Sequence, residues 1–401
     1  MVGAGFVGSA ALACKPAGSK SASSAAPQST SQSSGQPAGD AAFQKQWSAL
    51  VAQARAEKEL VAVLGPDTVD AEGKIYQHFG DVFGLKVTTV GGNSTDVTNR
   101  ILAERSQGLY TVDIGGLGGG GTIRILQAGA FAPLTPYFLA PDVLDRSKGW
   151  RVNYVPWSVD DKDQTHVTFY GLGVGSNLIQ IYYNTKNVTK QDLDSLQSWN
   201  DFLKPRWKGK IVVGDISNNE AEGNLTTAWL YLGKSYLEQL LQQKVAVVAY
   251  GDARTYSDGL ARGQWDIGLF SGASEQALVK ARQQGLPVDE LPVTFKEGTA
   301  AEITRNIGVI DHPAHPNVTK LFLNWYLSKD GQTSYNELNT RPNLVSLRSD
   351  VPQGKVPDAL WARASNPNLK IVDNNSEPYR AAKAASQAWS KQAFQQYGLR
   401  P

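Results

Sequence analysis

Small polar side chains recur in this chain where a predicted strand is followed by a predicted helix. Backbone N–H groups at a helix N-terminus, together with hydroxyl groups, form an anion site that needs no metal. The sequence therefore predicts that these residues contact a small anionic ligand. The predicted contacts are Pro66, Asp67, Asn93, Ser94, Thr95, Gly118, Gly119, Thr122, Ser217, Asn218, Asn219, Ser271 and Ser274.

Arginines near the same turns could supply positive charge to this site. Arg254, Arg305 and Arg341 are the candidates, and a guanidinium pairs bidentately with a carboxylate or a phosphate. We assign Arg254 and Arg305 to the site and expect a small organic anion, such as a carboxylate or a phosphate or phosphonate ester. The alternative is that Ser, Thr and Asn only cap helices, where they are common, and that the arginines are solvated or form salt bridges.

Signatures of catalysis and of cofactor binding are missing from the sequence. There is no G-x-S-x-G, no H-E-x-x-H and no G-x-x-x-x-G-K-[ST]. Residues 116–121 match G-x-G-x-x-G, but they do not follow the first strand, so we expect a glycine-rich turn. Residues 160–163 resemble half a calcium loop without its glycine and closing Glu. We therefore expect no enzyme, no cofactor and no metal site.

Strand-like and helix-like segments alternate along the chain with short connections. Such alternation is typical of α/β folds with parallel sheets, in which ligands bind at the carboxyl ends of the strands. We expect two doubly wound α/β lobes joined by a hinge, with the ligand cleft between them. Lobe 1 is predicted to span 41–177, with 305–401 returning to it, and lobe 2 to span 178–304. The predicted strands cover 60–65, 85–92, 110–116, 178–184, 210–215, 245–250, 265–270 and 303–310.

Composition limits the remaining classes of function. The 401 residues are 41% apolar and 19% charged, with a formal charge of +2, as in ordinary globular proteins. Lys and Arg are spread along the chain, so no basic surface for nucleic acid is predicted. We expect a monomer of about two domains.

The only cysteine, Cys14, ends a short apolar run and precedes a polar stretch. Small residues before a cysteine at this place resemble a bacterial lipobox, in which the cysteine is acylated after removal of the preceding residues. Residues 15–40 are rich in Ser, Ala, Gln, Gly and Pro, so they are predicted to form a flexible linker. We expect residues 1–14 to be a lipoprotein signal peptide with a lipidated Cys14, which would be the chain's only contact with a membrane.

Several motifs in the central and C-terminal parts are typical of one family. They are residues 99–104 (NRILAE), 127–134 (QAGAFAPL), 181–186 (IYYNTK), 198–211 (SWNDFLKPRWKGKI), 263–269 (GQWDIGL) and 315–317 (HPN). In this order they resemble the extracellular solute-binding proteins of ABC importers, in the subgroup related to periplasmic ferric-ion-binding proteins. The resemblance implies the periplasmic-binding-protein-like II fold, closure on a small molecule by hinge motion, and delivery to an ABC permease in the membrane.

The resemblance also raises the question of iron. Iron-binding relatives use adjacent tyrosines after the strand that corresponds to 265–270, where this chain has Phe270 and Ser271. Hard Fe(III) requires anionic oxygen ligands. Tyr182 and Tyr183 would point to opposite faces of a strand, so we expect them to be sheet residues. Iron binding, a sensory receptor of the same fold and a secreted enzyme remain alternatives to an organic-anion importer.

Overall fold

The computed structural model describes residues 39–399, except 159, 175–180, 218–221, 250, 272–273, 292–294, 296, 298–299 and 342–343. Cys14, most of the 15–40 linker, Asn218 and Asn219 lie outside the described residues. So do the side chains of Pro66 and Asp67.

The first sheet is mixed and has the order β12-β5-β11-β3-β1-β2, with β4 and β13 also paired to β11. Strand β1 pairs with β2 and β3 in parallel, whereas β11 runs antiparallel to β3 and β5. The strands are β1 Glu59–Leu64, β2 Lys86–Gly91, β3 Ile114–Gly116, β4 Phe131–Ala132, β5 Val167–Gly173, β11 Ala300–Ile310, β12 Leu344–Ser346 and β13 Lys370–Val372. The parallel part is therefore made of the βαβ units that the sequence predicted, and antiparallel strands from later in the chain extend it.

The second sheet has the order β10-β6-β9-β7-β8. Strand β7 pairs in parallel with β8 and β9. Strand β6 runs antiparallel to β9, and β10 runs antiparallel to β6 at the edge of the sheet. The strands are β6 Tyr182–Asn184, β7 Ile211–Gly214, β8 Ala246–Val248, β9 Ile267–Leu269 and β10 Val288–Glu290. Tyr182 is buried and Tyr183 is half-buried on β6, as alternation along a strand requires.

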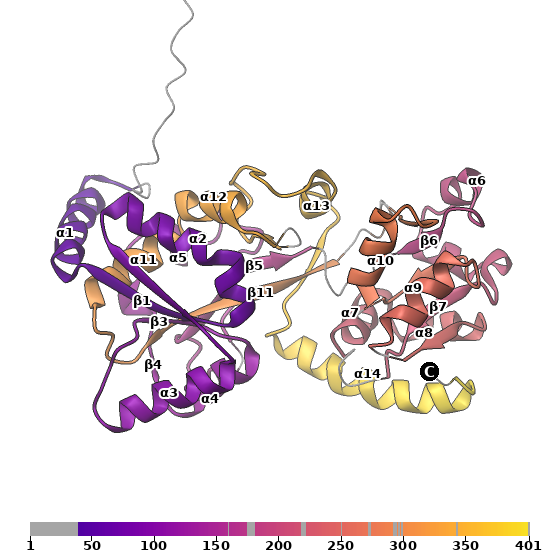
Figure 1. Ribbon diagram of the computed structural model, residues 1–401, viewed down its shortest axis with the longest axis horizontal. Helices are drawn as coiled ribbons and strands as arrows, with labels where there is room; N and C mark the ends of the chain where they lie inside the picture. The colour runs from indigo at the N-terminus through magenta and orange to yellow at the C-terminus, as the bar shows by residue number, and fades with distance from the viewer. Residues whose placement is uncertain are drawn as a thin grey trace, which may run out of the picture. The chain divides into compact units, whose positions relative to one another are not determined.

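Helices cover both faces of the first sheet (Figure 1). One face packs against α1, α2 and α11, and the other against α3 and α4. The helices of the chain are α1 Ala41–Glu57, α2 Pro66–Phe83, α3 Ser94–Ser106, α4 Gly119–Gln127, α5 Pro141–Leu144, α6 Lys190–Asp194, α7 Glu222–Leu232, α8 Lys234–Gln242, α9 Ala253–Ala261, α10 Glu275–Gln283, α11 Pro316–Leu327, α12 Lys329–Leu338, α13 Asp358–Ala364 and α14 Glu377–Gln396.

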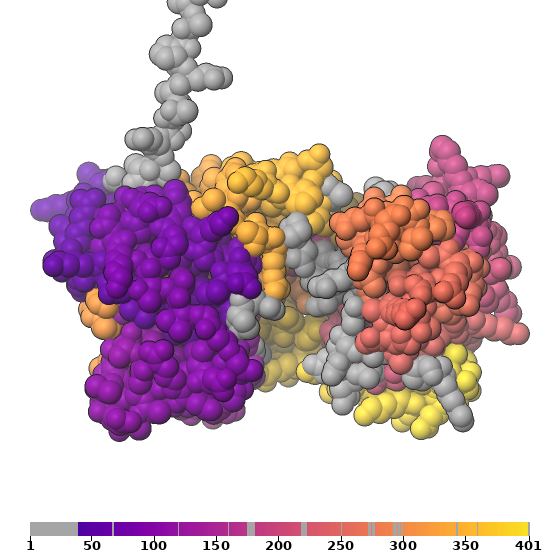
Figure 2. Space-filling model, viewed as in Figure 1, coloured from indigo at the N-terminus to yellow at the C-terminus, as the bar shows by residue number. Residues whose placement is uncertain are grey.

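The last helix, α14, packs against α7 and joins the hydrophobic core around the second sheet. Trp389, Ala393 and Phe394 of α14 belong to the core formed around that sheet. The rings of Trp389 and Trp229 have centroids 5.4 Å apart, and the space-filling view shows α14 in yellow against this layer (Figure 2). Part of segment 305–401 thus contributes to the second layer, because the apolar face of α14 is buried against α7. The lobe boundaries themselves remain a prediction.

Candidate functional site

A polar cavity of about 470 Å³ lies at the carboxyl ends of β1 and β3. Helices α2, α3 and α4 begin at its edge, since each follows a parallel strand and such strands end on the same side of a sheet. The lining residues come from six segments: Gly65 and Thr68; Ser94; Gly116, Leu117, Gly118, Thr122 and Ile123; Ser158, Asp160, Phe169 and Tyr170; Ile303, Thr304, Arg305 and Asn306; and Asn374 and Asn375.

The N-cap residues of α2 and α4 are both glycines, Gly65 and Gly118. The first N–H groups of a helix have no intrahelical acceptor, and a glycine N-cap has no side chain with which to accept from them. The two helix starts are adjacent, because a Cβ added to Gly65 would lie 3.7 Å from the backbone nitrogen of Gly118. Helix α4 therefore presents several first-turn N–H groups to the cavity. Helix α2 presents fewer, because Pro66 at its first position has no N–H and the N–H of Thr68 donates to the carbonyl of Gly65 at 2.9 Å, which leaves the N–H of Asp67. Both helix N-termini contribute positive partial charge.

Helix α3 differs because its N-cap is Asn93, whose side chain accepts a 2.8 Å hydrogen bond from the N–H of Thr95. Asn93 therefore has the capping role that we gave as the alternative, and Thr95 supplies the N–H that it caps. Ser94 lines the cavity, and a Cβ on Gly118 would stand 3.6 Å from its Oγ. Thr122, one turn into α4, is buried and donates to the carbonyl of Leu117 at 3.1 Å.

The cavity-lining residue Arg305 forms an ion pair with a buried carboxylate behind the lining. Arg305 of β11 places Nε 3.0 Å from Oε1 of Glu72 on α2, and its Nη1 donates to the hydroxyl of Thr68 at 2.9 Å. The side chains are 15% and 0% exposed, respectively. Oε2 of Glu72 accepts from the hydroxyls of Tyr170 at 2.8 Å and Tyr326 at 2.9 Å.

Burial and charge act in opposite directions on this pair. Burial raises the pKa of Glu72 although the Arg305 charge acts against it. Burial also disfavours the charged form of Arg305, but Glu72 and the surrounding tyrosines together leave the pKa of Arg305 raised. Arg305 therefore remains charged, and its formal charge is balanced by Glu72.

The backbone at Arg305 has a left-handed conformation in the middle of a strand, with φ of 61°. Opposite it on β5, a Cβ at Gly171 would lie 3.1 Å from Cγ of Arg305 and 3.1 Å from the carbonyl oxygen of Thr304. Glycine at position 171 therefore leaves room for the arginine side chain. Such backbone strain in non-glycine residues is concentrated at functional sites.

The sequence-predicted residues fall into separate groups. Ser94, Gly118, Thr122 and Arg305 line the cavity, and Gly119 begins α4 beside it. Ser217, Ser271 and Ser274 lie after β7 and β9 of the second sheet and are not among the cavity-lining residues. Arg254 also lies elsewhere: its side chain is 90% exposed on α9 and pairs with Asp258.

Sequence reasoning missed several lining residues, including Thr68, Asp160 and Tyr170. The start of α2 carried a usable signal, because proline at the first helical position after a glycine marks an N-terminus. That signal would have placed Thr68 in the first turn. Tyr170 could not have been found in the same way, since it reaches the site through the long-range pairing of β5 with β11.

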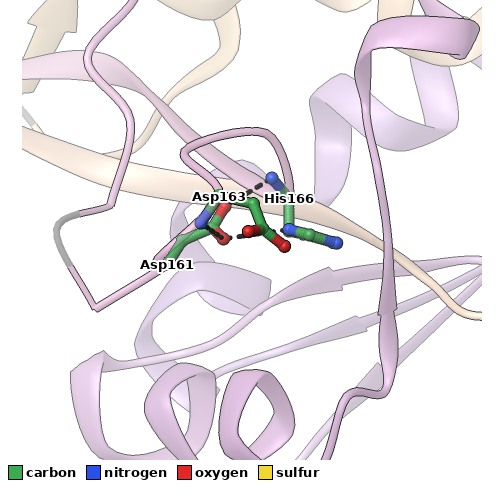
Figure 3. A group of neighbouring side chains, drawn as sticks. All are labelled: Asp161, Asp163 and His166. Carbon is green, nitrogen blue, oxygen red and sulfur yellow. Dashed lines mark hydrogen bonds and ion pairs between the residues drawn. The ribbon is translucent and has the colours of Figure 1, made fainter.

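A second group of ionisable side chains, Asp161, Asp163 and His166, lies in one loop (Figure 3). Asp161 is 4% exposed, and its Oδ1 accepts from Nδ1 of His166 at 2.9 Å and from the N–H of Asp163 at 3.3 Å. Its Oδ2 accepts from the N–H groups of Thr165 and His166. Burial favours the neutral acid, but these donors leave the pKa of Asp161 lowered. The Asp161 carboxylate is thus occupied in ordering its own loop.

Comparison with known proteins places the chain in a family. A family model described as bacterial extracellular solute-binding protein matches residues 74–365. The chain belongs to this family. It is therefore a solute-binding protein that acts outside the cytoplasm. The search of curated proteins gave no match. Among the described residues, no helix is both long and apolar enough to span a membrane.

Solved structures of low sequence identity share the fold of this solute-binding protein. The Trichodesmium protein IdiA (FutA), solved with iron and citrate, is 18% identical with a TM-score of 0.53, and the match covers 85% of this chain and 100% of that one. Ferric iron-binding protein A of Mannheimia haemolytica, in an open conformation, is 14% identical with a TM-score of 0.57 over 84% and 98% of the chains. Apo FutA2 of Synechocystis is 17% identical with a TM-score of 0.53 over 86% and 99%. The periplasmic-binding-protein-like II fold predicted from the sequence is thereby confirmed.

Proposed function

We propose that this solute-binding protein captures a small organic anion in the cavity at the starts of α2 and α4 and delivers it to an ABC permease. The observation that carries the proposal is the pair of glycine N-caps, Gly65 and Gly118, at a single polar cavity. A carboxylate or phosphoryl group can accept from several first-turn N–H groups at once. The cavity volume is also in the range of small-molecule sites. The protein binds and releases its ligand without catalysis.

Ferric iron is the second candidate, because related structures are named as iron-binding proteins. The donor set of the cavity favours the organic anion. Among the described lining residues, Asp160 is the only carboxylate and Tyr170 the only phenol. Asp160 pairs with Arg380 at 3.1 Å, and the hydroxyl of Tyr170 donates a hydrogen bond to Glu72. Fe(III) needs a set of anionic oxygens, which these two engaged groups do not supply.

Calorimetric titration against a ligand panel tests the proposed function. The panel should contain carboxylates, phosphate esters, phosphonates, neutral sugars, polyamines and ferric ion. We expect one class of organic anion to bind at one site per protein and to be recovered unchanged. Ferric ion alone should give no visible phenolate-to-iron absorption band. Turnover of a ligand, binding confined to sugars or polyamines, or a coloured ferric complex would each contradict the proposal.

We further propose that the protein is held at the membrane by acylated Cys14, with residues 15–40 as a flexible linker. Mass spectrometry of the N-terminal peptide from membrane-bound protein should show residue 14 as the first residue, with acyl chains attached. The matched control, Cys14→Ser, should be lost from the membrane fraction while its ligand binding stays unchanged. An N-terminal peptide that retains residues 1–13 and an unmodified cysteine would disprove the anchor.

A further inference from the structure

Glu72 is a fully buried carboxylate on the helix whose N-terminus borders the cavity. It does not line the cavity itself, yet it is linked to the lining by a short chain of contacts. Its Oε1 pairs with Nε of Arg305 at 3.0 Å, and Nη1 of the same guanidinium donates to the cavity-lining hydroxyl of Thr68 at 2.9 Å. Arg305, which carries the only formal positive charge among the described lining residues, is therefore opposed by a buried negative charge.

Several elements around Glu72 contribute ionisable groups. Arg305 comes from β11, Tyr170 from β5 and Tyr326 from α11, while Tyr76 lies one turn further along α2. Tyr335 of α12 and Arg341, which follows α12, also act electrostatically on this cluster. Burial raises the pKa of all four tyrosines. They therefore remain neutral hydroxyls, and Glu72 is the acid of the cluster that can exchange a proton.

We propose that Glu72 is a specificity-determining residue: its charge offsets that of Arg305, limits the negative charge accepted in the cavity, and is neutralised by a proton when a more highly charged anion binds. This inference rests on the proposed anion-binding function. A bound anion is attracted by Arg305 and repelled by Glu72, and both forces grow with the anion's charge. Uptake of one proton from solvent by the Glu72 carboxylate removes the repulsion and leaves the Arg305 charge unopposed.

The raised pKa of Glu72 supports this sequence of events, because it lowers the cost of adding the proton. The sign follows from linkage. If the anion binds more tightly to the protein with neutral Glu72, anion affinity rises as the pH falls through the Glu72 titration, and binding takes up protons. The two hydrogen bonds that Tyr170 and Tyr326 donate to Oε2 would keep the protonated side chain in place, with Oε1 carrying the proton.

The test compares wild-type protein with Glu72→Gln, an isosteric and permanently neutral replacement. The probes are acetate, malonate, citrate and inorganic phosphate, titrated calorimetrically between pH 5 and 8 in buffers of different ionisation enthalpy. We expect Glu72→Gln to bind the di- and trianions about tenfold more tightly than wild type at pH 8, with a smaller gain for acetate. Wild type should take up more protons per bound anion than Glu72→Gln does. Protons taken up or released by the probe itself are the same for both proteins, so they do not contribute to this difference.

Glu57→Gln is a matched control, because Glu57 is a half-buried carboxylate of the same layer that accepts from Asn317 and Val318 at the start of α11, outside the cavity lining. It should bind and take up protons as wild type does. Since Glu72→Gln removes a partner from a buried charge pair, thermal melting establishes that it is folded. The proton uptake of wild type can also be compared with the titration of the free probe, which needs no variant.

Two results separate failure of this inference from failure of the proposed function. Wild type that binds anions with the same proton uptake as Glu72→Gln, or a folded Glu72→Gln that binds polyanions no more tightly, overturns the role of Glu72 alone. Wild type that binds none of these anions and none of the organic anions of the panel overturns the proposed function, and the inference with it.

Discussion

Gly118→Asp is expected to lower the affinity for the anion by about 100-fold or more. The variant should be at least as stable as wild type. The new carboxylate would stand at the N-cap of α4 and accept from the same first-turn N–H groups that we assign to the ligand. It would also repel an arriving anion. Aspartate is a good N-cap and a favourable charge at a helix N-terminus, so the free energy of unfolding should stay the same or rise by a few tenths to about 1 kcal/mol. Calorimetry and thermal melting measure the two effects separately.

Gly118→Ala is the matched control for this substitution. Its Cβ would lie 3.6 Å from Oγ of Ser94, which is ordinary contact, and φ at Gly118 is −62°, which alanine adopts freely. The alanine variant offers no acceptor and should retain most of the affinity. An aspartate variant that binds the anion as tightly as wild type would show that the start of α4 is not the anion site.

Arg305→Met is expected to produce the largest loss of stability among the substitutions considered, about 3–5 kcal/mol. It leaves Glu72 fully buried without its ion-pair partner at 3.0 Å, and an unpaired buried charge is costly. Anion affinity should also fall, because the Glu72 charge is then unopposed. Adding Glu72→Gln to Arg305→Met removes both charges, so it should restore most of the stability and bring the affinity back toward that of wild type. Denaturant unfolding and calorimetry provide both measurements.

Arg254→Met is the control for Arg305→Met, since the sequence assigned both arginines to the site. The side chain of Arg254 is 90% exposed, and surface ion pairs contribute little to stability. Neither unfolding nor anion affinity should change. Equal losses in the two variants, or no rescue in the double variant, would contradict the account of the Glu72–Arg305 pair.

The local βαβ pattern is the part of the fold that the sequence predicted best. Strands β1, β2 and β3 and the helices between them are periodic and close in sequence, so their pairing follows from short right-handed connections. Because the starts of α2 and α4 follow neighbouring strands, Gly118 and Thr122 could be assigned to the same site as the first strand's turn. Ser94 could be assigned to this site for the same reason, because α3 follows the parallel strand β2.

Residues that reach the site through long-range pairing could not be predicted in this way. Strand β5 takes its place in the sheet by pairing with β11 and β12, both more than a hundred residues later in the chain. Tyr170 and the contacts of Glu72 depend on that pairing. Helix α14 behaves similarly: its amphipathic pattern indicates a helix, but nothing in that pattern states which sheet it covers. The turn after β8 resembles the others in sequence, but Arg254 is not among the cavity-lining residues and its side chain extends into solvent.

A crystal structure of the protein with the tightest-binding anion of the panel tests the central claim most directly. Our account predicts that oxygens of the acidic group lie within hydrogen-bond distance of first-turn N–H groups of α4 and of the N–H of Asp67 in α2, close to Thr68, Ser94 and Thr122. Arg305 should remain paired to Glu72 or lie beside a neutral Glu72. A ligand whose acidic group lies away from both helix starts, or a metal ion held by tyrosines in place of an anion, would contradict it.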